Sequence, residues 1–188
     1  MSFSSENKLY SYSDYCAWDD SERWELIEGV PFAMPPAPST FHQDILSELL
    51  YQFKRFLRGK PCKVYVAPFD VRLNADKDDN TVVQPDLAVI CDHSKIDEKG
   101  CKGAPDLVVE IISPASAVRD MLVKFRLYQD AGVREYWIVN PDTRTLHKYE
   151  LHDGDYVASV FGESDAVASK VLPGCEINFA DVFGQSGF

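Results

Sequence analysis

The fold is decided by the stretch from residue 82 to residue 140, which contains the runs VVQPDLAVI (82–90), PDLVVEIIS (105–113) and EYWIVN (135–140). These runs are short, apolar and rich in Val and Ile, as buried strands are. Residues 116–131, between the last two runs, have helical spacing and end at Gly132; the predicted helix has one apolar face, formed by Val118, Leu122, Phe125 and Tyr128 or Gln129. Strands interleaved with helices predict an α/β or α+β fold around a mixed sheet.

A second long helix is predicted earlier in the chain, from Ser39 or Thr40 to Gly59. Its apolar stripe consists of His42, Ile45, Leu46, Leu49, Phe53 and Phe56. The remaining predicted elements are a short helix at 11–18, a strand and turn at 24–31, strands at 63–73, 81–90 and 107–113, a hairpin at 145–151 and 156–160, and a last strand and helical turn before 183. No linker or repeat interrupts this order, so we expect one domain over residues 10–188, with residues 1–9 as a flexible N-terminus.

The composition predicts a globular protein that does not span a membrane. The chain has 188 residues, 45% of them hydrophobic, which suffices for a core and gives no case for disorder. The longest apolar runs, such as 136–139, are too short to cross a bilayer, and the N-terminus lacks the pattern of a secretory signal. We therefore expect a cytoplasmic protein without a membrane partner.

The five cysteines show no CxxC spacing, so reduced thiols are expected rather than a zinc site.

The net charge of −11 opposes binding to nucleic acid, which depends on Lys and Arg. The basic residues are nevertheless clustered, five of them at Lys54, Arg55, Arg58, Lys60 and Lys63 and three at Arg119, Lys124 and Arg126.

Two predicted strands carry an acid inside an apolar run, namely Asp86 and Glu110. An unpaired buried carboxylate costs several kcal/mol, so each acid needs a donor, a cation or a metal as its partner. Two carboxylates from adjacent strands suit Mg²⁺, which takes few protein ligands and keeps waters or phosphate oxygens. Lys124, eleven residues after Ser113, lies in the next helix and can reach the same place. The alternative is a buried ion pair with Lys124 or Arg126 that only stabilises the fold.

Other polar residues are weaker candidates. Asp106 lies four residues before Glu110 and is either a third ligand or, as the GAPD sequence favours, a turn acid. His42 is either a capping or core residue or a member of the site, and Glu48 is expected to be an exposed helical acid. Asp120 and Tyr128 flank Lys124 at four-residue spacing and are plausible partners for it. The remaining histidines form no evident triad with Ser or Cys, which leaves nucleophilic hydrolase chemistry without support.

The ordered string VVQPDLAVI…GAPDLVVEIISPAS…DMLVKFRLYQDAGVREYWIVNP is similar to the Uma-type restriction-endonuclease family, a branch of the PD-(D/E)XK nuclease superfamily. The likeness runs from about Trp24 to Phe183. It implies a restriction-endonuclease-like fold and Mg²⁺-dependent cleavage of nucleic acid, with Asp86 and Glu110 holding the metal. The superfamily's usual Lys falls two residues after the Glu, where this chain has Ile112, so the resemblance requires Lys124 in that role. The resemblance also implies that the predicted helix containing His42 lines the active-site cleft.

The leading hypothesis is thus an endonuclease that hydrolyses DNA with Mg²⁺, or with Mn²⁺ in its place, using Asp86, Glu110 and Lys124 with His42 beside them. The alternative is a catalytically silent nucleic-acid-binding or protein-interaction module that keeps the nuclease fold; the net charge and Ile112 favour it. Many such nucleases pair two copies to reach two strands, so a homodimer is compatible with the resemblance, although no residues mark an interface. Nothing in the sequence specifies a recognition site, DNA against RNA, or strand preference.

Overall fold

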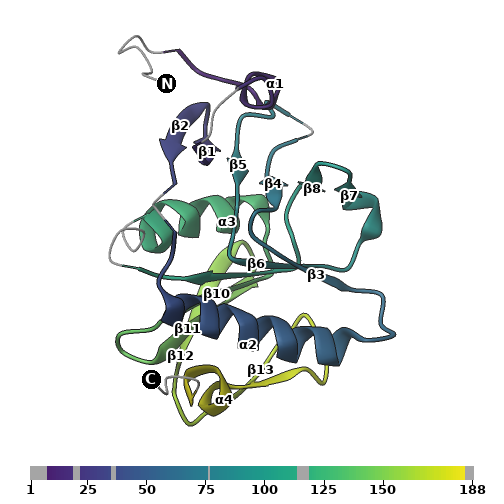
Figure 1. Cartoon of the computed structure of the whole chain (residues 1–188). Helices are drawn as coiled ribbons and strands as arrows, with labels where there is room; N and C mark the ends of the chain where they lie inside the picture. The colour runs from purple at the N-terminus through teal and green to yellow at the C-terminus, as the bar shows by residue number, and fades with distance from the viewer. Residues whose placement is uncertain (1–7, 19–21, 35–36, 76, 114–118, 185–188) are drawn as a thin grey trace.

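The computed structural model describes residues 8–18, 22–34, 37–75, 77–113 and 119–184. A core sheet dominates it, with the strand order β12-β11-β10-β9-β6-β3 (Figure 1). Neighbours in the core sheet run antiparallel except β9 and β10, which are parallel, so the sheet is mixed. The bounds of its strands are β3 Lys63–Val66, β6 Leu87–Ile90, β9 Leu107–Ile111, β10 Glu135–Asn140, β11 Thr145–His152 and β12 Asp155–Gly162. The expected mixed sheet is confirmed.

A second sheet has the strand order β2-β1-β5-β4-β8-β7. Its strands are short: β1 Trp24–Ile27, β2 Val30–Ala33, β4 Asp70–Arg72, β5 Val82–Val83, β7 Ile96–Asp97 and β8 Gly100–Lys102. The chain passes between the two sheets from β3 to β4, from β5 to β6 and from β8 to β9. A third, two-stranded sheet pairs β13 (Ala166–Ala168) with β14 (Glu176–Asn178).

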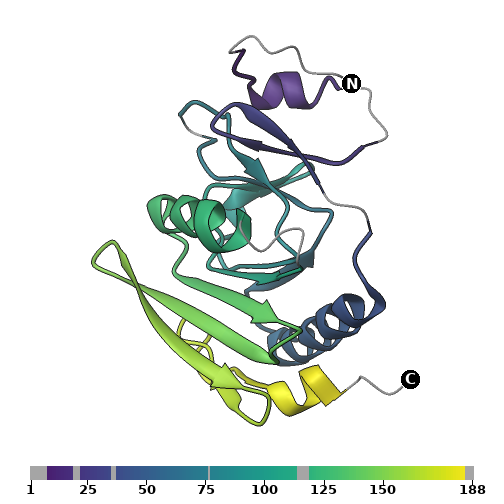
Figure 2. The ribbon, with the colours of Figure 1, turned by 90° about the vertical axis from the view of Figure 1, so that its left-hand side faces the viewer.

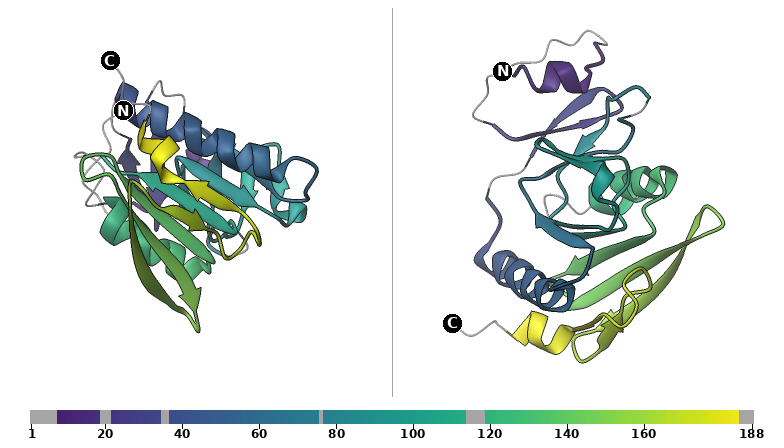
Figure 3. Two further views of the ribbon diagram at one scale, coloured as in Figure 1. Left: turned by 90° about the horizontal axis from the view of Figure 1, so that it is seen from below. Right: turned by 90° about the vertical axis from the view of Figure 1, so that its right-hand side faces the viewer.

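Helices cover both faces of the core sheet. The long helix α2 (Thr40–Leu57) begins at the N-cap Ser39 and packs on one face together with α4 (Phe179–Gly184), as Figure 3 shows from below. On the other face, α3 (Phe125–Ala131) lies on the side of the second sheet (Figure 2). The alternation of a strand explains this sandwich: in β9, Val109 faces α2, whereas its neighbour Val108 joins the cluster around α3. Two short helices, α1 (Tyr12–Tyr15) and η1 (His93–Lys95), complete this part of the fold.

Two predicted strands are each broken in two. The expected strand at 63–73 is β3 followed by β4, and the one at 81–90 is β5 followed by β6. Both breaks contain a proline, Pro68 and Pro85, which cannot donate to a ladder. The polar segment 92–100, which lies between the strands predicted at 81–90 and 107–113, contains η1 and β7 and reaches the start of β8. These short pieces build the second sheet, which the sequence analysis did not anticipate.

The helix predicted at 116–131 is less regular than expected. Residues Arg119–Lys124 form a π-helical segment, η2, that leads into α3, and Val118 lies outside the described residues. A π-turn adds a residue to each turn and rotates the side chains away from the α-helical pattern. Leu122, predicted on the buried face, is accordingly 64% exposed. The N-terminal segment 1–9 falls almost wholly outside the described residues.

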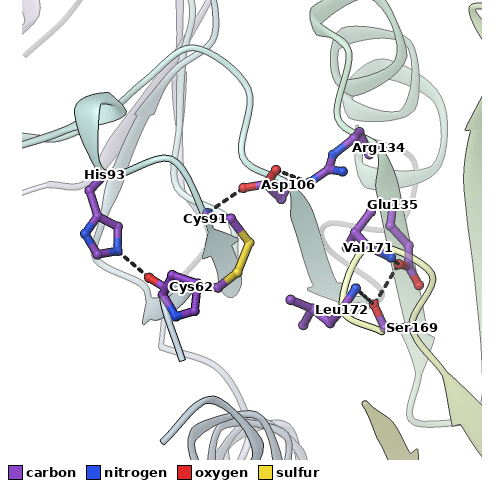
Figure 4. The surroundings of a disulfide bond; sticks show 10 residues. Cys62, Cys91, His93, Asp106, Arg134, Glu135, Ser169, Val171 and Leu172 are labelled. Atoms are coloured by element: carbon purple, nitrogen blue, oxygen red, sulfur yellow. Dashed lines mark hydrogen bonds and ion pairs between the residues drawn. A yellow bond between two sulfur atoms is a disulfide. The ribbon is translucent and has the colours of Figure 1, made fainter. Parts of the chain in front are cut away.

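The expectation of five reduced thiols is wrong for Cys62 and Cys91, which form a disulfide (Figure 4). Lys63 faces Ile90 across β3 and β6, so the next pair outward in this register is Cys62 with Cys91. The two cysteines are 29 residues apart, so the sequence gives no sign that they are neighbours in the fold. Cys16, Cys101 and Cys175 are free, and burial raises the pKa of the Cys101 thiol to about 11.

Within the described residues, none of the helices combines the length and the apolar character needed to span a bilayer.

Candidate active site

Two adjacent strands place Asp86 beside Glu110. Leu87 faces Val109 in the antiparallel register of β6 and β9, and one further step opposes Asp86 to Glu110. The backbone N–H of Ile111 donates to Asp86 Oδ2 over 2.8 Å, which fixes the carboxylate at the end of the ladder. The Asp86 side chain remains 21% exposed. The described residues supply no hydrogen bond to its second oxygen, Oδ1, which is open to a ligand.

Helix α3 and the segment before it bring a cation and a hydroxyl to Glu110. Lys124 Nζ lies 2.9 Å from Glu110 Oε1, and the Tyr128 hydroxyl donates to the same oxygen over 2.8 Å. Lys124 and Glu110 are only 5% and 4% exposed. Burial, followed by the charge of Glu110, raises the pKa of Tyr128 well above its usual value, so this phenol stays protonated and donates. The expected pairing of Lys124 with Glu110 is present.

A third carboxylate enters this group from the second sheet. Glu25, in β1, places Oε1 2.8 Å from Lys124 Nζ and is 1% exposed. The backbone N–H of Gln84 donates to the same Glu25 oxygen over 3.0 Å. Lys124 therefore bridges two carboxylates, one from each sheet, and ties the second sheet to the core sheet at this point.

His42, near the start of α2, reaches Asp86 from the other side. Its Nε2 lies 3.3 Å from Asp86 Oδ2, whereas its buried Nδ1 has no hydrogen-bond partner in the described structure. His42 is thus a partner of Asp86 and lies against its carboxylate from the side of α2.

A polar network continues outward from Gln84. Its side-chain Nε2 donates to Asp70 Oδ1 over 2.9 Å and contacts the Tyr15 hydroxyl, while its Oε1 accepts from Arg23. Burial raises the pKa of both Asp70 and Tyr15. Gln84 therefore links Glu25 to a second acid at the edge of the site.

The chain matches the model of the Uma2 family, described as "Putative restriction endonuclease", over residues 11–180. It belongs to the Uma2 family. An uncharacterized protein of Synechocystis sp., slr1290, is 27% identical over 166 residues, which cover 86% of this chain and 85% of that protein. The crystal structure titled as a putative nuclease belonging to DUF820, from Anabaena variabilis, superposes with a TM-score of 0.74 at 19% identity, covering 93% of this chain and 97% of that one. That likeness confirms the predicted fold.

Several candidates of this Uma2 member lie elsewhere. Asp106 accepts from the backbone N–H of Cys91 and pairs with Arg134, so it fastens the start of β9, as a turn acid would (Figure 4). Glu48 accepts from the Gln52 side chain within α2. Arg126 is exposed on α3, which excludes it as the buried cation. The side chain of Asp120 lies outside the described residues.

Glu25 is the residue that the sequence analysis missed. The same criterion that selects Asp86 and Glu110, an acid inside an apolar strand, applies to WELI at residues 24–27. The run is only four residues long, and its proximity to the other two acids depends on the pairing of β1 with β5, at Leu26 and Val82. Spacing along the chain does not reveal that contact.

The carboxylates fit a hard divalent cation by the chemistry of their donors. Carboxylate oxygens are the ligands that Mg²⁺ and Mn²⁺ prefer. Within the described ranges, no three His, Cys, Asp or Glu side chains converge as a complete cage. Mg²⁺ typically uses one or two carboxylates plus waters and substrate oxygens, so a complete cage is not required. Asp86 and Glu110 can supply those two carboxylates.

Tyr128→Phe tests the hydrogen bond to the buried Glu110. A bond to a charged group contributes about 1.5–3 kcal/mol, so we expect this loss in the free energy of unfolding, measured by urea titration. Tyr156→Phe is the matched control, because its hydroxyl donates over 2.9 Å to the neutral carbonyl of Val133. The control should lose only about 1 kcal/mol. Equal losses in the two variants would contradict a charged acceptor at Tyr128.

Proposed function

We propose that this chain is an Mg²⁺-dependent endonuclease that hydrolyses phosphodiester bonds of DNA, with Mn²⁺ able to substitute. The observation that carries the proposal is the contact of Lys124 with Glu110 and Glu25, together with the register that opposes Asp86 to Glu110 across β6 and β9. Membership of the Uma2 family and the fold shared with a protein titled as a putative nuclease support it. The order of acids and lysine also supports a place in the PD-(D/E)XK superfamily.

Each side chain of the proposed site has a distinct role. Asp86 and Glu110 would hold the cation, and Glu25 adds a third carboxylate nearby. Asp86 is oriented by the Ile111 N–H and by His42, whereas Glu110 is oriented by the Tyr128 hydroxyl. Lys124 supplies an ammonium group that can donate a hydrogen bond to a phosphate oxygen or to the attacking water. Bound Mg²⁺ supplies Lewis acidity and a water of lowered pKa.

Plasmid cleavage tests this proposal directly. We expect purified protein to convert supercoiled plasmid into nicked and linear forms with Mg²⁺ or Mn²⁺, and chelation with EDTA to reduce cleavage to background. A covalently closed circle has no ends, so this substrate reports endonuclease rather than exonuclease activity. Restoring the metal should restore the activity. Cleavage that persists in EDTA would refute the role of the metal.

The second candidate is a catalytically silent module that binds nucleic acid or protein through the same fold. The observation that favours it is the deep burial of Glu25 and Glu110, both already paired with Lys124. Titration calorimetry separates the two candidates. The endonuclease should bind Mn²⁺ through Asp86, whereas the silent module should leave plasmid intact and show no Mn²⁺ heat that depends on Asp86.

A further inference from the structure

Away from the candidate site, five basic side chains gather where α2 ends and β3 begins. Residues 49–69 contain five charged residues, all of them basic: Lys54, Arg55, Arg58, Lys60 and Lys63. All five are exposed. The chain as a whole has a net charge of −11, whereas this segment carries only positive charge.

The cations of this basic segment have no acidic partners among the described residues. Elsewhere, basic side chains such as Arg72, Lys102 and Lys148 form ion pairs with nearby carboxylates. The dipole of α2 favours the cations at its C-terminal end, Lys54 and Arg55 in the last turn and Arg58 at the C-cap. Lys60 lies over the Phe56 ring, 3.0 Å from its centre. These contacts leave the five positive charges without a compensating carboxylate among the described residues, which indicates an external anionic partner.

A preformed groove of about 690 Å³ lies within this basic segment. Leu57, Val64 and Tyr65 contribute apolar surface to it, while Lys54, Arg58 and Lys63 contribute positive charge. Tyr51, which is 57% exposed, also lines it, with the Arg55 guanidinium 5.7 Å from its ring centre. Cations interleaved with an exposed aromatic ring are typical of surfaces that follow a nucleic-acid backbone.

The helix α2 connects the groove to the candidate site. Figure 1 shows α2 running the length of the core sheet, with β3 starting beyond its far end. His42 contacts Asp86 near the beginning of this helix, and Arg55 lies thirteen residues later. At 1.5 Å per residue, the groove is about 20 Å from the site. A duplex advances 3.4 Å per base pair, so it covers this distance in roughly six base pairs.

We propose that this groove binds the phosphate backbone of the nucleic-acid substrate about six base pairs away from the bond that is cut. This inference rests on the proposed nuclease function. It identifies the surface that overcomes the unfavourable net charge, because local cations rather than the total charge contact the phosphates.

The test compares two triple variants that remove the same charge. Lys54→Gln with Arg58→Gln and Lys63→Gln neutralises the groove, whereas Lys77→Gln with Lys99→Gln and Lys170→Gln neutralises three exposed lysines elsewhere. Binding to a fluorescein-labelled duplex of about 30 base pairs is measured by anisotropy in EDTA, over a range of salt concentrations, so that no cleavage interferes. Thermal unfolding checks that both variants fold.

We expect the groove variant to bind at least about 10-fold more weakly at low salt, and the slope of log K against log salt to fall by about 2.7, or 0.9 for each lost phosphate contact. The control variant should keep the wild-type affinity and slope. Equal weakening in both variants, or in neither, would overturn the proposal. Cleavage at the centre of a duplex of about 8 base pairs should be unaffected by the groove substitutions, because only about four base pairs lie on either side of the cut bond, fewer than the roughly six needed to reach the groove.

These measurements separate the inference from the function on which it rests. Binding that depends on the groove, without any metal-dependent cleavage by the wild type, would retain the surface and reject the nuclease. Metal-dependent cleavage by the wild type, with unchanged binding in the groove variant, would retain the nuclease and reject the surface.

Discussion

Lys124→Met is expected to lower the free energy of unfolding by about 3–5 kcal/mol and to abolish cleavage. Methionine keeps the length and apolar stem of lysine, so the packing changes little. The ammonium, however, lies within 2.9 Å of oxygens from both Glu25 and Glu110, and its removal leaves two carboxylates buried without it. Burying a charge without its partner is costly, and urea titration measures that cost.

Lys148→Met provides the matched control for the loss of a buried lysine. Lys148 lies 3.6 Å from Glu135 and 2.7 Å from Glu150, away from the candidate site. Glu135 also accepts from the Trp137 indole, the Ser169 hydroxyl and the backbone of Val171, so it stays hydrogen-bonded in this variant. We expect a smaller loss of stability and unchanged cleavage. Full cleavage by Lys124→Met would show that this lysine serves only the fold.

The two central acids could be predicted because a carboxylate inside an apolar strand is unusual. Asp86 and Glu110 stand in apolar runs, where a carboxylate needs a partner, and the register of β6 and β9 does place them opposite each other. Glu25 meets the same criterion but comes from the second sheet, whose short strands pair over long distances in the sequence. Its contact with Lys124 is a tertiary property that no local pattern encodes.

The errors in the predicted strands and in the predicted state of the cysteines also arise from contacts between residues that are distant in the sequence. The long helix α2 was predicted, with its start at Ser39 or Thr40, because its apolar stripe is a local signal; the structure makes Ser39 its N-cap. The strands at 63–73 and 81–90 were predicted unbroken because apolar residues stand on both sides of the short links 67–69 and 84–86, where the chain passes between the two sheets. The pairing of Cys62 with Cys91 follows from the register of β3 and β6, which the spacing of the cysteines does not contain.

Asp86→Asn is expected to reduce cleavage on the order of 10³-fold, which corresponds to about 4 kcal/mol in the activation barrier. Asparagine has nearly the same shape and retains a carbonyl oxygen that can accept from the Ile111 N–H. It lacks the negative charge and the second acceptor that a hard cation requires. The fold should therefore persist, while the heat of Mn²⁺ binding in calorimetry should disappear.

Asp106→Asn is the control that distinguishes Asp86 from Asp106, both of which follow a proline. Asp106 is held by the backbone N–H of Cys91 and by Arg134, and we place it outside the site. Its replacement should cost stability through the weakened contact with Arg134, yet leave Mn²⁺ binding and cleavage unchanged. The opposite pattern, with Asp106→Asn inactive and Asp86→Asn active, would move the metal site to Asp106. Retention of both activities in Asp86→Asn would remove this carboxylate from the chemistry, because a neutral amide cannot replace a charged ligand of Mg²⁺ without loss.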